Sequence, residues 1–395
     1  MIKRFVLYLL CMLCAIAPVG CVASQEPDAE PPVAATGIII IDNITENGVE
    51  STTLATQEPQ QEPQQEPQQE PQPQPPYVEL LISAGGDVTL GGNRKGNPKS
   101  TIYTREFAKQ NNNLAFAFRN VRDILEQDDL TIMNFEGTLT TSSIPGNNNE
   151  YQFRVDPEHV GVLTHGSVEM VTIENNHTMD FGSIGFDDTM RALDAAGIAY
   201  AHKTHLAEYT VKGVTVGMLA YQTFGGIHDQ IREQLLIDIP EARKTCDVVI
   251  VYYHWGAEKD YAPNSAQIAL GRATIDAGAD LVLGAHSHRI NPIELYNGRY
   301  IVYSLSNFSF SGNSMPSDMD TFLFQLKLRV SGESVETVDM RIIPMRISSR
   351  ADTNDFAPTP YAPGSKAAQA VVDRMIKEGK NLRYALGEYP TEWRD

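Results

Sequence analysis

From residue 77 onward, short apolar runs alternate along the chain with longer stretches of helical periodicity. The runs are rich in β-branched and other apolar residues and are expected to form strands over 78–84, 130–134, 168–173, 214–221, 248–253 and 281–284. The stretches 186–196 and 266–277 are expected to be helices, because each ends at a glycine that can stop a helix, Gly197 and Gly278. This alternation predicts an α/β domain whose strands are largely buried.

After residue 292 the pattern changes to strands without long helices between them. Strands are expected over 293–296, 300–305, 321–330 and 337–347, and one helix over 365–378. We therefore predict a main domain over 77–350. The remaining residues, 351–395, are predicted to form a C-terminal extension that packs on it.

The first twenty residues have the pattern of a targeting segment. Lys3 and Arg4 precede an apolar stretch over 5–17, which is the length of a signal peptide and short for a membrane span. Pro18-Val19-Gly20-Cys21 then resembles a bacterial lipobox, in which Cys21 would be acylated. We predict a lipoprotein-type signal peptide over 1–20, with a plain secretory signal cleaved near Ala23 as the alternative. The expected location is the extracellular face of the cytoplasmic membrane, held by lipid at Cys21, or else the medium.

Residues 21–76 are predicted to be a disordered linker. Four copies of Q-E-P-Q occupy 57–72, and regular proline among Gln and Glu disfavours a packed core. Only Cys246 remains outside the N-terminal 21 residues, so disulfides are not expected to hold the domain together.

The composition excludes one class of partner. The 395 residues include 50 acidic and 31 basic side chains, which gives a formal net charge of -19. Such a surface repels phosphate backbones, so nucleic acid is not an expected partner. An anionic substrate would bind only where local cations or metal ions reverse the field.

Polar clusters follow five of the predicted strands. They contain Asp87, Glu136, Asn176 with His177, His254, and His286 with His288. In open α/β sheets, sites form beyond the carboxyl ends of the strands, so these side chains are expected to converge if the strands are parallel. His286 and His288 have a β-type spacing that would turn both to the same side.

Carboxylate, amide and imidazole together form a coherent ligand set for a divalent metal. This mixture suits Mn, Fe or Zn better than Ca, and a bridging carboxylate would allow one or two ions. Each cluster also has a structural alternative: Asn134 and Asn176 as Asx turns, Glu136 as a solvated loop carboxylate, and His254 beside Trp255 as a packed core histidine.

The order of these residues resembles the calcineurin-like metallophosphoesterase superfamily and, more closely, the bacterial capsule synthesis CapA family of poly-γ-glutamate biosynthesis. The closer likeness covers about 80–310 and includes Gly86-Asp87-Val88-Thr89, Asn134-Phe135-Glu136, Asn175-Asn176-His177, His254-Trp255-Gly256-Ala257-Glu258 and Ser304-Leu305-Ser306-Asn307. The resemblance implies a four-layer α/β/β/α sandwich.

The resemblance also implies roles for single residues. Glu136 would bridge two metal sites, with Asp87 and His288 completing one of them and Asn176, His254 and His286 the other. His177 would protonate the leaving group or stabilise charge, and Asp180 would orient it. Apart from the resemblance, we expect Asn175 to serve mainly the backbone geometry of this cluster.

Four positions depart from the superfamily pattern. Thr89 stands where phosphoesterases have a ligating histidine, Glu136 replaces an aspartate, and Asn175 and Thr178 replace residues around the Asn-His pair.

Two functions follow as hypotheses. The first is a cell-surface, metal-dependent hydrolase or transferase acting on an anionic capsule polymer or a phosphoester. The second is a non-catalytic accessory or anchoring subunit that partners a membrane polymer synthase and export complex.

Overall fold

The computed structural model describes residues 76–92 and 101–394. The predicted signal peptide 1–20, the proposed lipid attachment at Cys21 and all but the end of the predicted linker 21–76 lie outside these residues. Among the described helices, none combines the length and the apolar character needed to cross a bilayer.

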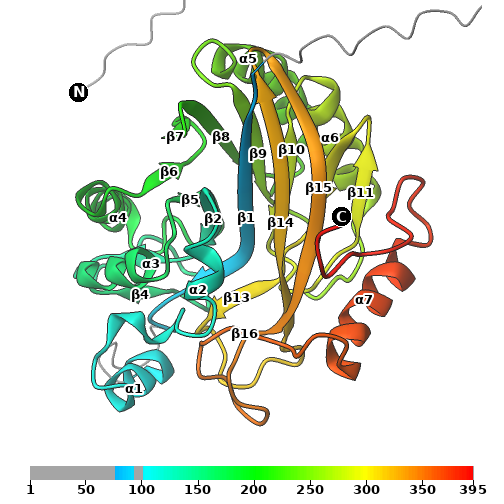
Figure 1. Ribbon diagram of the computed structural model, residues 1–395. Coiled ribbons are helices and arrows are strands. Elements are labelled where there is room, and N and C mark those ends of the chain that lie inside the picture. The colour runs from blue at the N-terminus through cyan, green and yellow to red at the C-terminus, as the bar shows by residue number, and fades with distance from the viewer. Residues whose placement is uncertain (1–75, 93–100, 395) are drawn as a thin grey trace, which may run out of the picture. The chain divides into compact units, whose positions relative to one another are not determined.

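The first sheet is built around β1 and has the order β16-β15-β14-β1-β2-β5-β6, with β13 also pairing with β1 (Figure 1). β1, β2, β5 and β6 are parallel, whereas β14 and β15 run antiparallel to their neighbours. The bounds are β1 Val78–Thr89, β2 Leu130–Phe135, β5 Met170–Thr172, β6 Ala199–Ala201, β13 Asn307–Phe310, β14 Asp320–Ser331, β15 Ser334–Arg346 and β16 Thr359–Pro360.

The second sheet has the order β11-β12-β10-β9-β8-β7, and its central strands β8, β9, β10 and β12 are parallel. The bounds are β7 Ala207–Val211, β8 Val214–Gln222, β9 Val248–His254, β10 Leu281–Ala285, β11 Ile293–Tyr296 and β12 Arg299–Val302. A separate two-stranded sheet joins β3 (Thr138–Leu139) to β4 (Arg154–Val155).

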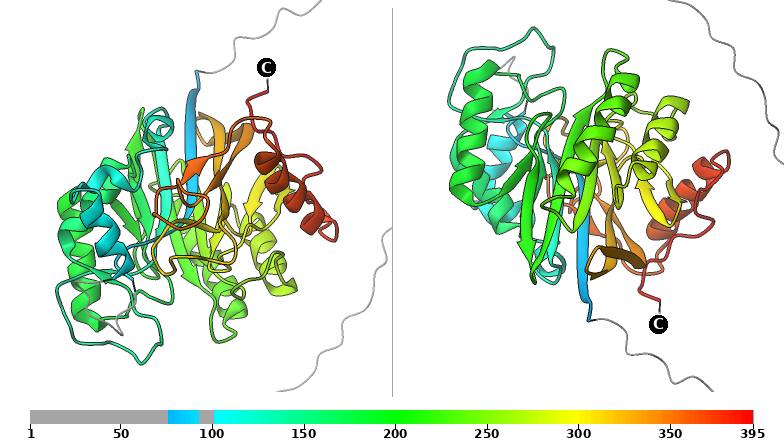
Figure 2. Two further views of the ribbon diagram at one scale, coloured as in Figure 1. Left: turned by 90° about the horizontal axis from the view of Figure 1, so that it is seen from below. Right: turned by 90° about the horizontal axis from the view of Figure 1, so that it is seen from above.

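Helices cover the outer face of each large sheet (Figure 2). The helices on the first sheet are α1 Ile102–Lys109, α2 Arg122–Leu125, α3 Gly161–His165 and α4 Gly182–Ala196, with 3-10 turns at Leu114–Phe116 and Pro157–Val160. The second sheet is covered by α5 His228–Ala242 and α6 Ser265–Asp276. The last helix, α7 Lys366–Gly379, is capped by Ser365 and packs on β14 and β15.

Three apolar clusters explain this layering. One lies between the two sheets and joins, for example, Ile82 to Leu283. A second lies between the first sheet and its helices, and a third lies between the second sheet and α5 and α6. β2 shows the principle, since Ile132 faces the inner cluster and Met133 the outer one. The predicted four-layer α/β/β/α sandwich is thereby confirmed.

Carboxylates at the amino ends of the parallel strands tie each strand to its neighbour. In each case an acidic residue just before one strand accepts a hydrogen bond from a main-chain N–H of the adjacent strand. The pairs are Leu81 to Asp129 at 2.9 Å, Thr131 to Glu169 at 2.9 Å, Thr215 to Asp247 at 2.8 Å and Val249 to Asp280 at 2.9 Å. These repeated hydrogen bonds fix the register of adjacent strands at their amino ends.

Two of the differences from the predicted strands shape the site. β1 does not stop at residue 84 but continues through Gly85 and Gly86 to Thr89, where it pairs with β2 and β13. The strand expected over 300–305 ends at Val302, because the following backbone turns toward β1 and the main-chain N–H of Asp87 donates to Ser306 O at 3.0 Å.

The segment after residue 350 lies against the main domain. Beyond α7, the hydroxyl of Tyr389 accepts a hydrogen bond from the main-chain N–H of Ile293 at 3.0 Å. Side chains of α7 and Tyr389 also belong to the apolar cluster between the sheets. The C-terminal segment therefore extends the inner core past β11.

Candidate metal centre

The end of β1 carries Asp87 into the centre of the site. This placement depends on Gly86, because a β-carbon there would lie only 1.8 Å from the carbonyl oxygen of Ser306. The close approach lets the Asp87 N–H bond to that oxygen. The Asp87 carboxylate is fully buried, and its Oδ1 accepts a hydrogen bond from Asn134 Nδ2 at 2.7 Å.

The ligand atoms of Asp87, Glu136 and His288 all lie within 4.8 Å of one another, and the two carboxylates are buried whereas His288 is partly exposed. Nδ1 of His288 is 2.8 Å from Asn307 Oδ1 in hydrogen-bond geometry, and 3.0 Å from Asp87 Oδ2 without it. Among the described residues, neither Asp87 Oδ2 nor Glu136 Oε1 has a hydrogen-bond partner. Two buried carboxylate oxygens without donors, next to an imidazole, fit a divalent cation.

Thr89, at the end of β1, contacts the Glu136 carboxylate. Its hydroxyl donates to Glu136 Oε2 at 3.1 Å, so it fixes one oxygen of that carboxylate and leaves Oε1 free. Thr89 therefore orients the Glu136 carboxylate. The first site therefore offers one imidazole, from His288, beside the two carboxylates.

His254, His286 and Asn176 lie together on the other side of Glu136. Nε2 of His254 is 2.8 Å from Asn176 Oδ1, 3.0 Å from His286 Nδ1 and 3.6 Å from Glu136 Oε1. The ring of Phe224 packs against His286 at 4.6 Å between centroids. The structure thus brings all six predicted ligands to one place, with Glu136 between the two groups.

His286 and His288 reach the site by a different backbone path from the predicted one. β10 ends at Ala285, and both histidines have positive φ angles, 94° and 52°. The β-type spacing assumed from the sequence is therefore wrong. The two rings, with centroids 6.2 Å apart, are directed by a loop held in the left-handed region, which is unusual for non-glycine residues and typical of functional sites.

Asn134 is a site residue that the sequence reasoning treated only as a turn candidate. Besides its bond to Asp87, its Nδ2 lies 3.4 Å from His254 Nδ1, and its Oδ1 accepts from Asn175 Nδ2 at 3.1 Å. It links the carboxylate group to the imidazole group. The signal was present in the sequence, because Asn134 is the last polar residue before Glu136 on a fully buried strand.

His177 lies at the edge of the centre, in the loop between β5 and α4. Its Nδ1 is 2.7 Å from Asp180 Oδ2 and its Nε2 is 3.9 Å from Glu136 Oε1. Asp180 Oδ2 also accepts the main-chain N–H of Phe153 at 2.7 Å, and the Phe153 ring packs on the imidazole at 4.4 Å. Asn175 Oδ1 accepts the His177 N–H at 3.1 Å.

Burial and neighbouring charges shift the pKa values of these groups in different directions. Burial lowers the pKa of His254 well below its ordinary value and that of His286 to about 4, so both are neutral imidazoles at pH 7. Burial, aided by Asp87, raises the pKa of Glu136 to about 7. For His288, burial acts to lower the pKa, but the Glu136 and Asp87 carboxylates outweigh it and raise the pKa to about 9. A cation binding here would therefore displace protons.

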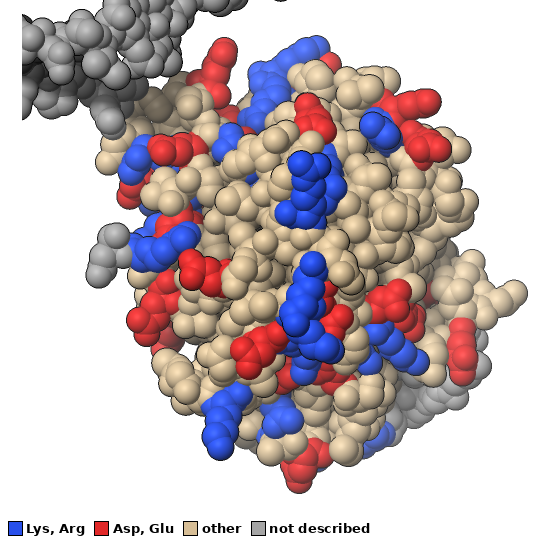
Figure 3. Space-filling model, turned by 90° about the vertical axis from the view of Figure 1, so that its right-hand side faces the viewer, with Lys and Arg blue, Asp and Glu red and all other residues tan. Residues whose placement is uncertain are grey.

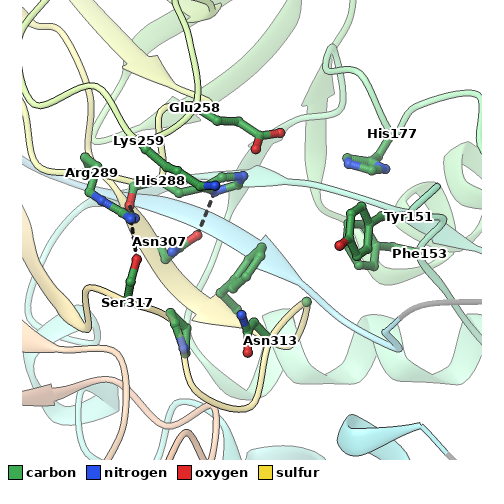
Figure 4. A pocket seen from close by; sticks show the side chains of 13 residues that line it. Tyr151, Phe153, His177, Glu258, Lys259, His288, Arg289, Asn307, Asn313 and Ser317 are labelled. Atoms are coloured by element: carbon green, nitrogen blue, oxygen red, sulfur yellow. Dashed lines mark hydrogen bonds between the residues drawn. The ribbon is translucent and has the colours of Figure 1, made fainter. Parts of the chain in front are cut away.

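A pocket of about 270 Å³ opens beside the centre (Figure 4). His288 and His177 line it together with Phe153, and Glu258, Lys259 and Arg289 extend its wall. In Figure 4, His177 and Phe153 face the His288 side across the pocket. A substrate in this pocket would touch both the group that fits a metal and the proposed acid.

Comparison with known sequences identifies the family. The profile of "Bacterial capsule synthesis protein PGA_cap" matches residues 81–311, more than half of the chain. The chain belongs to this family. The resemblance drawn from the motifs is confirmed, and all six predicted ligands lie within the part that matches the PGA_cap profile.

Individual relatives agree with this assignment. A "PGA biosynthesis protein CapA" of Bacillus subtilis (strain 168) is 31% identical over 281 residues, which cover 66% of this chain and 71% of that protein. A "Capsule biosynthesis protein CapA" of Bacillus anthracis is 27% identical over 59% of this chain and 61% of its own length. A "Probable polyglutamine synthesis accessory protein" of Mycobacterium tuberculosis is 27% identical over 56% of this chain and 66% of its own length.

Solved structures also resemble this chain, at low identity. A novel phosphatase of Mycoplasma pneumoniae superposes with a TM-score of 0.44 at 12% identity, over 71% of this chain and 95% of that one. A hypothetical protein of Thermus thermophilus has a TM-score of 0.42 at 15% identity, over 68% of this chain and 99% of that one.

Proposed function

We propose that the protein takes part in poly-γ-glutamate capsule biosynthesis at the cell surface, as a metal-dependent hydrolase or transferase acting on an anionic polymer or a phosphoester. The observation that carries the proposal is the group of Asp87, Glu136 and His288, in which two buried carboxylate oxygens lack donors. The names of the capsule-biosynthesis relatives support the process.

Asp87, Glu136 and His288 would hold one divalent ion, and Asn176, His254 and His286 would hold a second beside Glu136. Mn, Fe or Zn suits this mixture of ligands better than Ca. A bound ion would supply Lewis-acid polarisation of the reacting carbonyl or phosphoryl oxygen. The neutral state of His254 and His286 suits ligation, because only the neutral imidazole has a free lone pair.

His177 is suited to the role of acid. Its Nδ1 is engaged by Asp180, so Nε2 is the nitrogen that faces the centre. Burial acts to lower the pKa of His177, but the hydrogen bond with Asp180 and the charge of Glu136 outweigh it and raise the pKa. In hydrolysis, a water oxygen would bond to the carbonyl carbon or phosphorus while the bond from that atom to the amine nitrogen or alkoxide oxygen breaks. Nε2–H would donate its proton to this leaving group, and the proton that the attacking water loses would return to Nε2 through solvent.

The test compares the purified full chain with a His254→Ala/His286→Ala double variant, and uses His202→Ala as a control in a loop away from the centre. We expect the wild type and the control to contain metal and to turn over a generic phosphoester or poly-γ-glutamate. The double variant should lose both properties. Full turnover without His254 and His286 would overturn the proposed chemistry.

One residue of this chain and the name of one relative favour a second function. Thr89 removes an imidazole from the first site, and the Mycobacterium tuberculosis relative is named as an accessory protein. The alternative is a non-catalytic subunit that binds the polymer and partners a membrane synthase and export complex. Co-purification with such a synthase, together with a metal-free chain, would favour it over the enzyme.

We also propose that Cys21 carries a lipid that holds the protein on the extracellular face of the cytoplasmic membrane. The basic, apolar and small-residue order of 1–20 supports this anchor. Metabolic labelling with a fatty acid should mark the wild type and leave Cys21→Ala unlabelled and released from membranes. Cys246→Ala is the matched control and should remain labelled.

A further inference from the structure

We infer that the pocket beside His288 is a subsite for an anionic oxygen group of the substrate, a carboxylate or a phosphate, and that Lys259 is its specificity-determining residue. This inference rests on the proposed function, because it assigns a substrate class to the same site. It concerns the wall of the pocket away from the metal ligands, where two cations lack acidic partners.

Lys259 is placed at the pocket by an unusual backbone. Its φ angle is 71°, and its main-chain N–H donates to Ser287 O at 2.7 Å, in the loop between the paired histidines. A lysine in the left-handed region is strained, and such strain persists where the surroundings hold it. The side chain is exposed, and among the described contacts its ammonium has no hydrogen-bond or ion-pair partner.

Arg289 supplies a second, more rigid cation. It is 7% exposed, and its guanidinium donates to His288 O and to Ser317 Oγ, both at 2.7 Å. Its Nε is buried and has no hydrogen-bond partner among the described residues. Its guanidinium also lies 5.5 Å from the centre of the Tyr261 ring.

Two more exposed guanidinium groups of this fold are neutralised by carboxylates. Arg272 pairs with Glu294 at 2.5 Å, and Arg119 with Asp355 at 2.7 Å. Arg289 bonds only to neutral oxygens in the described ion pairs and hydrogen bonds. A buried cation without a counter-ion is costly, and an anion entering the pocket would remove that cost.

Glu258 limits where the anion can lie. Its carboxylate lines the same pocket, and it acts to raise the pKa of both His286 and His288, so its charge acts on the imidazoles. In Figure 4 its carboxylate points toward the His177 side, whereas Arg289 points toward Ser317. The favourable position for an anion is therefore the side of the pocket with Lys259 and Arg289. The anion bound there would be the substrate group next to the reacting bond.

A γ-linked glutamate polymer has the chemistry for this position. Each of its residues carries a free carboxylate close to the amide link, so a carboxylate next to the reacting amide would lie near the pocket wall. Because the chain as a whole has a net charge of -19, such a polymer needs a local cationic contact to bind. A phosphate group of a phosphoester would use the same contact.

The experiment measures binding by titration calorimetry with the metal-loaded full chain. The probes are a short oligo-γ-glutamate, the same oligomer with its free carboxylates converted to amides, and inorganic phosphate. We expect the wild type to bind the acid more tightly than the amide. Lys259→Met should weaken binding of the acid about threefold to fivefold and leave the amide unchanged. Lys259→Arg should retain most of the preference.

Lys366→Met, at the exposed start of α7, is the matched control and should bind all three probes as the wild type does. If phosphate binds through Lys259 and the oligomer does not, the subsite is supported and the anionic group that it binds belongs to a phosphoester. If Lys259→Met binds every probe as the wild type does, or if the wild type prefers neither anion, the inference is overturned. Binding through Lys259 without turnover would instead overturn the proposed hydrolase and leave the subsite standing.

Discussion

Oδ2 of Asp180 lies 2.7 Å from Nδ1 of His177 and also accepts the main-chain N–H of Phe153 at 2.7 Å. One carboxylate oxygen therefore fixes the orientation of the imidazole and connects it to the wall of the pocket. Nε2 of His177 is thereby turned toward the centre, 3.9 Å from Glu136 Oε1.

Replacing Asp180 with asparagine should lower the pKa of His177, because the Asp180 carboxylate is one of the groups that raise it against the effect of burial. We expect turnover to fall by up to about 100-fold, since less of the imidazole is protonated and its orientation is looser. Metal content should not change. The pKa is measured by NMR titration of the histidine ring signals.

Asp187→Asn, on the exposed side of α4, is the control for this change and should leave the His177 titration as in the wild type. An unchanged His177 pKa in Asp180→Asn would contradict the pairing.

The outline of the fold and the members of the centre could be predicted from the sequence, whereas several of the contacts that hold them could not. Buried strands and the polar residues that follow them are local patterns. The extension of β1 through Gly86 depends on the backbone of Ser306, more than two hundred residues further along the chain. The positive φ angles of His286 and His288 likewise follow from tertiary contacts.

α5 shows the same limit among the helices. Pro240 lies inside it, and local rules would end the helix there, yet Ile231, Leu235 and Ile239 pack into the core over the second sheet. Tertiary burial outweighs the local preference.

Glu136→Gln should abolish stabilisation by added metal. In the wild type, a divalent ion at one hundred times its dissociation constant should raise the free energy of unfolding by about 2.7 kcal/mol. The variant lacks the anionic Oε1 and should show little change. In chelator above pH 7 it should unfold no more easily than the wild type, because burial and Asp87 oppose ionisation of Glu136. Calorimetric melting with and without metal measures both effects.

Glu233→Gln, on the exposed surface of α5, is the matched substitution and should be stabilised by metal as the wild type is. Equal stabilisation of Glu136→Gln would show that the metal binds elsewhere.

Asp128 should make the stability of the metal-free protein depend on pH. Burial raises the pKa of Asp128 from 3.8 to about 7, and Glu169 and Asp129 add to the shift. Because the folded pKa is raised, the contribution of this group is full below about pH 4 and is lost as pH rises through about 7. Asp128→Asn should therefore lose less stability over this window, by about 1–3 kcal/mol. Urea unfolding at several pH values measures the difference.

Asp123→Asn, on the exposed face of α2, controls for the loss of one acidic charge. If the free energy of unfolding changed with pH in the same way in Asp128→Asn and in the wild type, the buried carboxyl would not be the source of the pH dependence.

Basic and acidic side chains are intermixed among the described residues on the face that Figure 3 shows. Among the described residues, several basic and acidic side chains form pairs, for example Arg374 with Asp318 and Asp320, both at 2.8 Å. Pairing of this kind weakens the electrostatic field around each charged group. By contrast, no described ion pair includes Lys259 or Arg289 of the pocket wall.

Gly86→Ala should disturb the centre without touching any ligand. The new methyl group would lie 1.8 Å from Ser306 O and 2.7 Å from Leu305 O, and main-chain atoms cannot move aside as a flexible side chain can. We expect a loss of about 1–3 kcal/mol in the free energy of unfolding, together with weaker metal binding, because Asp87 would be displaced. Gly387→Ala is the control, since nothing lies within 4 Å of its β-carbon position. Metal affinity in Gly86→Ala equal to that of the control would show that the approach of β1 to Ser306 does not position Asp87.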